Sequence, residues 1–315
     1  MMTDTNHYHA PKWIKGGHAQ TISPKLFRYP KAPFRRELRL DSTGKTQVAY
    51  DFIDAPENAP TVVLFHGLEG SSRSHYAESL AREVHRRNWR LIVVHFRSCG
   101  GVPNTAPVFY HAGDSFEIAF VLNQLKKEFP TLYAAGVSLG GNALAKYLGE
   151  HNVTAVCEAA AVISAPLDLP AASIALNRPF ARTVYAPYFL KTLIPKAIEF
   201  TGDSPEKWKD CTNLRDFDNR FTSQLYNFID ADDYYHHASA MPHLKNITVP
   251  TLIINAKNDP FFPPDALPTE EDVSMSVSLL QPEEGGHVGF VDLHRKDVFS
   301  WLPETVLNFF EKPWE

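Results

Sequence analysis

Short apolar runs recur along the chain, separated by longer polar or amphipathic stretches. Apolar runs of strand length lie at residues 61–66, 91–96, 132–135 and 159–164, and two further strands with a turn between them are expected at 34–40 and 47–53. Stretches of helix-forming residues lie between them, at residues 74–87, 114–129 and 142–149. The runs at 61–66 and 91–96 are continuously apolar, which is typical of parallel strands buried on both faces. This alternation predicts an α/β fold with a doubly wound, mostly parallel sheet.

The alternation is interrupted between about Pro166 and Pro250. That stretch is rich in aromatic residues and punctuated by prolines. So long an interruption inside a compact domain predicts a structured insertion, which we expect to be helical. Strands then return at residues 251–255 and 274–280, followed by a last helix at 298–311.

These limits divide the chain into an arm, a core made of two segments, and an insertion within the core. The arm, residues 1–34, is broken by Pro and Gly, and its Trp13, Ile14 and Phe27 predict that it packs on the body. With 315 residues, 44% of them hydrophobic, the chain can bury one large core. The other two parts are the core, residues 35–165 and 250–315, and the helical insertion after the sixth strand, residues 166–249.

Residues 136–140 read Gly-Val-Ser-Leu-Gly and stand between an apolar run and a helix-forming segment. A strand, a sharp turn and a helix are the context that makes G-x-S-x-G a nucleophile elbow. Side chains at Gly136 or Gly140 would collide with the neighbouring strand and helix, and the strained turn lifts the hydroxyl of Ser138 above the sheet. The following helix points free N–H groups and its positive dipole end at the same place. The alternative is a glycine-rich turn with an incidental serine.

Two of the strands that follow the insertion supply candidate partners for Ser138. Asp259 lies in a loop just past the strand at 251–255, and His287 follows the strand at 274–280. The chain order Ser138, Asp259, His287 is that of the α/β-hydrolase fold. Because these loops share the carboxyl edge of a parallel sheet, we expect the three side chains to converge. His287 would then take the serine proton, while Asp259 orients the imidazole.

Other residues compete for these roles. Asp168, after the sixth strand, is a rival acid, and Asp259 itself fits a plain Asn-Asp-Pro turn. His294 is a rival base close to His287. Two histidines inside or at the end of apolar strands, His66 and His95, are expected to be buried structural residues.

A His-Gly turn after the third strand is where this fold supplies a second oxyanion donor. We therefore expect the backbone N–H groups of Leu68 and Leu139 to form the oxyanion hole. Glu69 would place a carboxylate beside a developing oxyanion, which is unfavourable. We expect it to turn away, toward Arg73 or Arg97.

Composition narrows the class further. The net charge of -5 gives no reason to expect nucleic-acid binding. Three cysteines without metal-type spacing predict free thiols in a reducing compartment. The first residues lack the basic and apolar regions of a signal peptide, and no apolar run is long enough to span a bilayer, so we expect a cytoplasmic protein without stable membrane insertion.

Three weaker signals favour structural roles. Arg215 and Asp218, three residues apart, predict an ion pair on a helix rather than a substrate clamp. Cys99, beside two glycines, predicts a packed thiol rather than a site residue. Adjacent acids and histidines on one helix point in different directions, so we expect no metal site at Asp230, Asp232, Asp233, His236 and His237.

Taken together, the motifs resemble those of the YheT family of α/β-hydrolases. The matching segments span nearly the whole chain and are residues 16–21, 66–72, 96–101, 110–113, 136–142, 215–218 and 285–290. The resemblance implies a Ser138–Asp259–His287 triad and a cap over the site made by the insertion. For chemistry of this kind we expect no cofactor. The family usually reads Asp-Asp-Pro where this chain has Asn258-Asp259-Pro260, so the second acid is retained.

These observations predict a serine hydrolase that cleaves carboxylic esters of short to medium acyl chains through an acyl-enzyme. A thioesterase, amidase or lipase on the same triad is the alternative, as are cofactor-free peroxidase chemistry and a non-catalytic ligand-binding protein. Apolar residues of the insertion predict an acyl wall or, alternatively, its own core: Phe180, Tyr185, Tyr188, Phe189, Leu190, Leu193 and Ile194. Cations interleaved with them predict transient contact with an anionic interface: Arg178, Arg182, Lys191 and Lys196.

Overall fold

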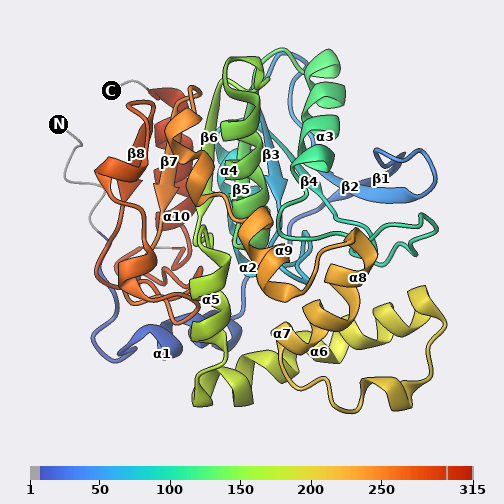
Figure 1. Cartoon of the computed structure of the whole chain (residues 1–315). Helices are drawn as coiled ribbons and strands as arrows, with labels where there is room; N and C mark the ends of the chain where they lie inside the picture. The colour runs from blue at the N-terminus through green and yellow to red at the C-terminus, as the bar shows by residue number, and fades with distance from the viewer. Residues whose placement is uncertain (1–7, 296, 314–315) are drawn as a thin grey trace.

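The computed structural model describes residues 8–295 and 297–313 and contains an eight-stranded sheet (Figure 1). The strand order is β1-β2-β4-β3-β5-β6-β7-β8. β2 runs antiparallel to β1 and β4, and all other neighbours are parallel, as the sequence predicts. The strands are β1 (Arg35–Leu40), β2 (Gln47–Ile53), β3 (Thr61–Phe65), β4 (Arg90–Val94), β5 (Leu132–Val137), β6 (Ala159–Ile163), β7 (Thr251–Ile254) and β8 (Val277–Leu280).

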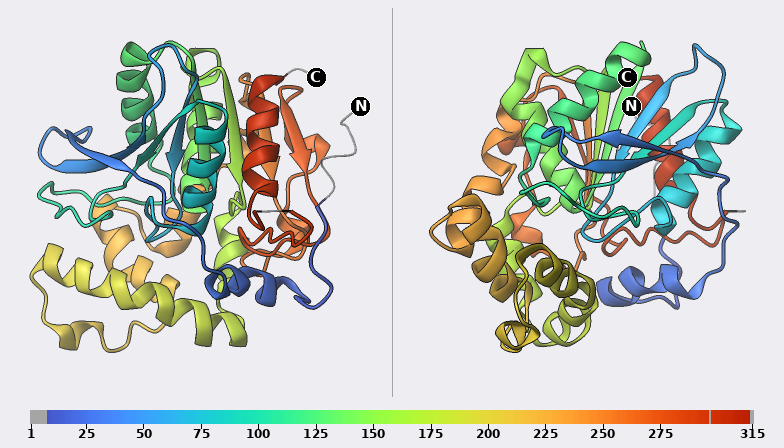
Figure 2. Two further views of the ribbon diagram at one scale, coloured as in Figure 1. Left: turned by 180° about the vertical axis from the view of Figure 1, so that it is seen from behind. Right: turned by 90° about the vertical axis from the view of Figure 1, so that its right-hand side faces the viewer.

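Helices cover both faces of the sheet, which explains the continuously apolar strands (Figure 2). In β3, Val63 and Phe65 join the core on one face, and Val62 and Leu64 join the core on the other. The first core includes α3 (Ser115–Glu128) and α4 (Leu139–His151), and the second includes α2 (His75–Arg86) and α10 (Trp301–Glu311). The carboxyl edge of the sheet is therefore left for the site.

The last strand and the last helix are shorter than expected. β8 begins at Val277 rather than at residue 274, because Ser274 and Val277 close a turn through a backbone hydrogen bond of 3.1 Å. α10 begins at Trp301 rather than at residue 298. Asp297 forms a turn there, since its carbonyl oxygen accepts from the backbone N–H of Ser300.

Every regular element between β6 and β7 is helical, as the sequence predicts. α6 continues through Pro187 and Pro195, two of the prolines that punctuate the insertion. These helices lie beyond the carboxyl ends of the strands (Figure 1). None of the helices in the described ranges is both long and apolar enough to cross a bilayer. The helices are α5 (Leu169–Leu176), α6 (Pro179–Thr201), α7 (Leu214–Phe217), α8 (Ser223–Tyr226) and α9 (Ala231–Ala238), with short 3₁₀ and π turns among them.

The arm packs on the body through part of its apolar residues. Ile14 is buried with Val291 and Phe299, and Phe27 meets Phe299 edge to face. Trp13 was expected to pack as well, but it is 64% exposed. The arm contains α1 (Gly17–Ile22) and a 3₁₀ turn at Ser23–Leu26. Residues 1–7 of the predicted arm lie outside the described residues, and the division into arm, core and insertion as folding units stays a prediction.

Candidate active site

Ser138 stands between β5 and α4 in a strained backbone conformation, with φ 53° and ψ -117°. A Cβ atom at Gly136 would lie 2.5 Å from the carbonyl oxygen of Gly140. One at Gly140 would lie 2.5 Å from the carbonyl oxygens that end β3. The predicted collisions are confirmed, and the tight turn holds the serine at the carboxyl edge of the sheet.

The structure brings together the three side chains that the sequence proposed. Nε2 of His287 lies 3.0 Å from Oγ of Ser138, and Nδ1 lies 2.8 Å from Oδ2 of Asp259. The Asp259 side chain is fully buried, and its other oxygen accepts from the backbone N–H of Phe261 at 2.8 Å. Because a carboxylate only accepts, the proton belongs on Nδ1, which leaves Nε2 free to accept the serine proton.

The rival residues have other roles. Asp168 caps α5 by accepting from a backbone N–H, and His294 is exposed on a loop. His66 and His95 are buried, with both ring nitrogens of each bound to backbone groups. Burial lowers the pKa of both, that of His66 to about 3, so these rings stay neutral.

The backbone N–H groups of Leu68 and Leu139 remain available near the serine. Within the described ranges, no hydrogen bond uses either group. A Cβ atom at Gly67 would lie 3.7 Å from Oγ of Ser138, so the chain passes the hydroxyl just before Leu68. Both donors therefore lie on the two turns that flank the hydroxyl, as an oxyanion hole requires.

Glu69 turns away from the serine, but its expected partners are wrong. Its carboxylate pairs with Lys196 of α6 at 2.7 Å and accepts from the hydroxyl of Tyr110 at 2.6 Å. Arg73 pairs with Glu78 instead. The other expected partner, Arg97, is committed to three acids around it, Asp41, Asp114 and Glu117. The insertion thus neutralises the carboxylate beside the proposed oxyanion hole.

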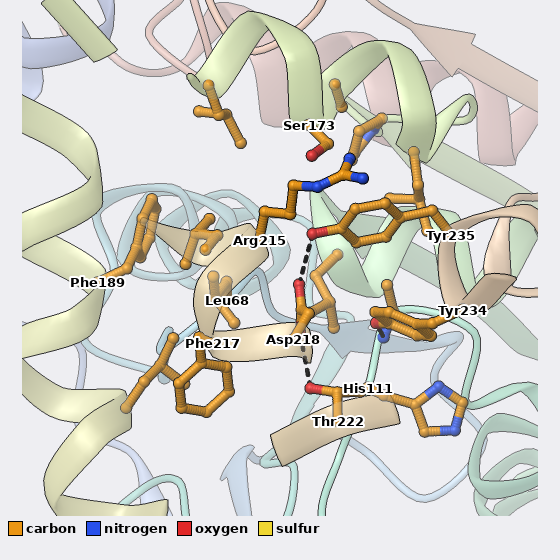
Figure 3. A pocket seen from close by; sticks show the side chains of 18 of the residues that line it. Leu68, His111, Ser173, Phe189, Arg215, Phe217, Asp218, Thr222, Tyr234 and Tyr235 are labelled. Atoms are coloured by element: carbon orange, nitrogen blue, oxygen red, sulfur yellow. Dashed lines mark hydrogen bonds between the residues drawn. The ribbon is translucent and has the colours of Figure 1, made fainter. Parts of the chain in front are cut away.

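Two cavities meet at Ser138. The narrower one has a volume of about 120 Å³ and lies under the insertion (Figure 3). Its wall near the serine is apolar and includes Leu68, Leu139, Leu169, Ala172, Phe189, Leu193 and Phe217. An apolar wall beside a nucleophile suits a hydrocarbon chain.

The wider cavity has a volume of about 540 Å³ and lies between the arm, the loop after β3, and α6. Polar and charged side chains line much of it, among them Thr21, Lys25, Ser71, Arg73 and Tyr185. His287 lines this cavity and not the narrower one. The two sides of the serine therefore differ in size, in polarity and in access to the imidazole.

The predicted ion pair between Arg215 and Asp218 is wrong. Arg215 pairs with Asp232, while Asp218 accepts from the hydroxyls of Thr222 at 2.7 Å and Tyr235 at 2.8 Å (Figure 3). The reason is local, since α7 ends at Phe217 and a π-helical turn begins at Asp218, which breaks the expected i, i+3 geometry. Burial raises the pKa of Asp218 to about 6.

The residues proposed as an acyl wall divide among several places. Phe189 lines both cavities, Leu193 the narrower one, and Tyr185 and Tyr188 the wider one. Phe180 is 44% exposed and lines neither. The remaining two, Leu190 and Ile194, pack against the core. Part of the set therefore lines the cavities and part packs in the core, and the acyl wall stays a prediction.

Cysteines and acids outside this site have structural surroundings. All three cysteines are buried and free. Burial raises the pKa of Cys99 to about 12, and this thiol lines neither cavity. Asp230 caps α9 by accepting from the backbone N–H of Asp233, and the carboxylate of Asp233 accepts from the backbone N–H of Ile229. Over residues 8–295 and 297–313, no group of three or more His, Cys, Asp or Glu side chains is arranged to hold a metal ion.

Two contributions to the site were missed from the sequence. The ring of Phe261 stacks on the imidazole of His287, with centroids 3.8 Å apart, and the Phe-Phe pair that follows Asp259 and Pro260 was the available signal. The second contribution is backbone strain in the loops at the carboxyl edge of the sheet. Several non-glycine residues with positive φ lie in the connections that leave the carboxyl ends of strands. They are Glu69 after β3, Ser98 after β4, Ser138 after β5, Ser164 after β6 and Val288 after β8. Such strain is typical of functional sites, and of these positions the sequence predicted it for Ser138 alone.

Comparisons with known proteins show the family of this chain. A model of the alpha/beta hydrolase fold family matches residues 60–292. The chain is 38% identical to the YheT protein of Escherichia coli (strain K12), over 92% of this chain and 88% of that one. The chain belongs to the α/β-hydrolase fold family and, within it, to the YheT family.

Other α/β-hydrolases extend the comparison. The phospholipase ABHD3 of Homo sapiens is 28% identical, over 91% of this chain and 74% of the human protein. A solved esterase of Pyrococcus furiosus, PF2001, superposes with a TM-score of 0.60 at 14% identity, covering 97% of this chain and 96% of the esterase. At that identity the likeness shows the shared fold alone.

Proposed function

We propose that this α/β-hydrolase cleaves carboxylic esters through an acyl-enzyme formed on Ser138. One observation carries the proposal: Oγ of Ser138 lies 3.0 Å from Nε2 of His287 where an apolar and a polar cavity meet. A nucleophile within hydrogen-bond reach of a base that a buried carboxylate orients is the arrangement needed for acyl transfer.

The reaction proceeds in two halves. Nε2 of His287 takes the proton of Ser138 as Oγ bonds to the acyl carbon, and the N–H groups of Leu68 and Leu139 bind the oxyanion. The imidazolium, stabilised by Asp259, then protonates the alcohol oxygen as its bond to the acyl carbon breaks. Water adds to the acyl-enzyme with His287 as base, and the carboxylic acid leaves with Ser138 restored.

The cavities give the substrate its direction. The leaving alcohol must receive its proton from His287, which lines only the wider cavity, so the alcohol part extends there. The acyl chain then enters the narrower apolar cavity, and the insertion acts as a cap over it. A cavity of about 150 Å³ holds one benzene molecule, so a volume of about 120 Å³ accepts a short acyl chain or the first carbons of a longer one.

A lipase that works at an interface is the second candidate, and a stripe on α6 favours it. Phe180, Val184 and Tyr188, each four residues apart, are 44%, 38% and 56% exposed. The last two also border the wider cavity. An exposed apolar stripe with exposed cations such as Arg182 and Lys191 on the same helix suits transient contact with a lipid surface. The phospholipase name of the human relative points the same way.

A fluorophosphonate probe tests the hydrolase proposal. Wild-type protein should label covalently, Ser138→Ala should not, and Ser204→Ala, on the exposed surface of the insertion, should label like the wild type. Equal labelling of wild type and Ser138→Ala, or none in either, would overturn the proposal. A thioester or amide series beside the esters decides between the leaving groups that the same triad can expel.

A series of p-nitrophenyl esters from acetate to dodecanoate separates esterase from lipase. Values of kcat/KM that rise with acyl length up to medium chains and then fall indicate a finite acyl cavity. Rates that rise steeply only above micelle formation indicate an interfacial lipase. Acetate as the best substrate would contradict the assignment of the narrower cavity to the acyl chain.

A further inference from the structure

The arm lies against both loops that carry the proposed acid and base, although the proposed chemistry does not use it. α1 lies beside the loops of the C-terminal part of the chain (Figures 1 and 2). A Cβ atom at Gly17, in α1, would lie 1.8 Å from the carbonyl oxygen of Asn258. The arm therefore packs backbone to backbone on the loop of Asp259.

Three consecutive backbone N–H groups lead into the imidazole of His287, and each donates to a side-chain oxygen. Two of these oxygens belong to the arm, and the third belongs to the residue before Asp259. The bonds run from Gly285 to Oε1 of Gln20 (2.8 Å), from Gly286 to Oδ1 of Asn258 (2.9 Å) and from His287 to Oγ1 of Thr21 (2.8 Å).

Gln20 joins the two loops directly. Its side chain is buried at 2% exposure, and Oε1 accepts from Nδ2 of Asn258 at 2.9 Å as well as from Gly285. Its Nε2 donates to the carbonyl oxygen of Ile14 and to Glu284. Every polar atom of the amide is therefore used to tie the arm to the acid loop and to the base loop.

The loop of His287 needs such support because it is strained. Val288, a β-branched residue, has φ 57°, which costs free energy and persists only when the surroundings over-determine it. Ser164 and His75 hold Val288 from the side of the sheet. The arm holds the other side of the loop, next to His287.

We propose that Gln20 and Thr21 are positioning residues, which set the place of the His287 imidazole relative to Ser138 and Asp259. This inference rests on the proposed function, since positioning has a readout only if Ser138 is a nucleophile. Misplacement of a reacting group by about 1 Å costs on the order of 100-fold in rate. Loss of one of the three bonds should therefore cost about tenfold.

Thr21→Val and Thr21→Ser form the decisive pair in the full-length protein. Valine has nearly the same shape but removes the oxygen that accepts from His287, whereas serine keeps it. We expect Thr21→Val to lower kcat about tenfold at unchanged KM, with fluorophosphonate labelling slowed in proportion. Thr21→Ser should stay within about twofold of the wild type. Gln20→Met should lower kcat more, because it frees two loops.

Two arm variants control for simple destabilisation, with all assays well below each variant's Tm. Ile14→Val thins the packing of the arm without touching the three bonds, and Trp13→Ala changes an exposed residue. Both should keep the wild-type kcat. The positioning role is overturned if Thr21→Val keeps its kcat, if Thr21→Ser is as slow as valine, or if Ile14→Val is equally slow. Wild-type protein that neither labels nor hydrolyses any ester would overturn the proposed function and the positioning role with it.

Discussion

The two cavities that meet at Ser138 are built by different parts of the chain. The narrower one, of about 120 Å³, is walled by the turns of the sheet edge and by the helices of the insertion. The wider one, of about 540 Å³, is walled by the arm, the loop after β3, and α6. Only the wider one includes the imidazole of His287. Under the proposed function, this difference predicts that acyl length is selected tightly and the alcohol loosely.

The largest expected effect on the rate concerns His287, next to the serine at which the two cavities meet. His287→Ala should lower kcat by about 10⁴ or more for every ester, because each ester needs the imidazole to take the proton of Ser138. His294→Ala, on an exposed loop, should leave kcat unchanged. Steady-state kinetics on acetate and octanoate esters measure both. Near-normal turnover of His287→Ala would assign the base elsewhere.

A lower pH should also slow ester hydrolysis, through the same catalytic base. Imidazolium cannot accept the proton of Ser138, so wild-type ester hydrolysis should fall as the pH drops. A pH–rate profile of kcat/KM on a soluble ester measures this fall. A flat profile down to pH 4 would contradict a histidine base.

A bulky residue in the narrower cavity should slow the hydrolysis of long-chain esters more than that of short-chain esters. Ala172 lines that cavity from α5, and Ala172→Phe should take the room of about three methylene groups. At about 0.8 kcal/mol each, kcat/KM for octanoate should fall about fiftyfold relative to acetate. Ile174→Phe, on the same helix but 67% exposed, is the matched control. An unchanged ratio would place the acyl chain in the wider cavity.

Loss of Lys196 should slow the hydrolysis of short-chain and longer-chain esters to the same extent. Lys196→Met leaves the carboxylate of Glu69, only 8% exposed, without its cation beside the proposed oxyanion hole. We expect kcat to fall about tenfold for acetate and octanoate alike. Lys191→Met, exposed on the same helix, should have no effect. Glu69→Gln added to Lys196→Met should restore part of the rate; failure to restore any would show that charge is not the cause.

The smallest expected effect concerns the polar wall of the narrower cavity. Burial raises the folded-state pKa of Asp218 to about 6, so its ionisation opposes folding at higher pH, and the penalty fades as the pH falls toward 4. Asp218→Asn should therefore raise Tm at pH 8 by about 3 °C, and the gain should vanish near pH 4. Asp265→Asn, on the surface, should shift nothing. A gain independent of pH would contradict the titration.

The sequence by itself determined the elements and the candidate triad. Apolar runs of strand length and the strand–turn–helix setting of Ser138 are local patterns, so they could be predicted with small errors at the ends of β8 and α10. The chain order of Ser138, Asp259 and His287, together with the rule that parallel strands share one edge, then brought three distant residues together.

Only the tertiary structure decided which side chains support that triad. Lys196 rather than Arg73 or Arg97 pairs with Glu69, a partner 127 residues away, and Arg215 turns to Asp232. Gln20 and Thr21 meet the loop of His287 across 265 and 266 residues. A hydrogen bond or ion pair depends on which atoms lie within about 3 Å. That proximity is fixed by the packing of insertion and arm against the sheet, and no periodicity in the chain records it.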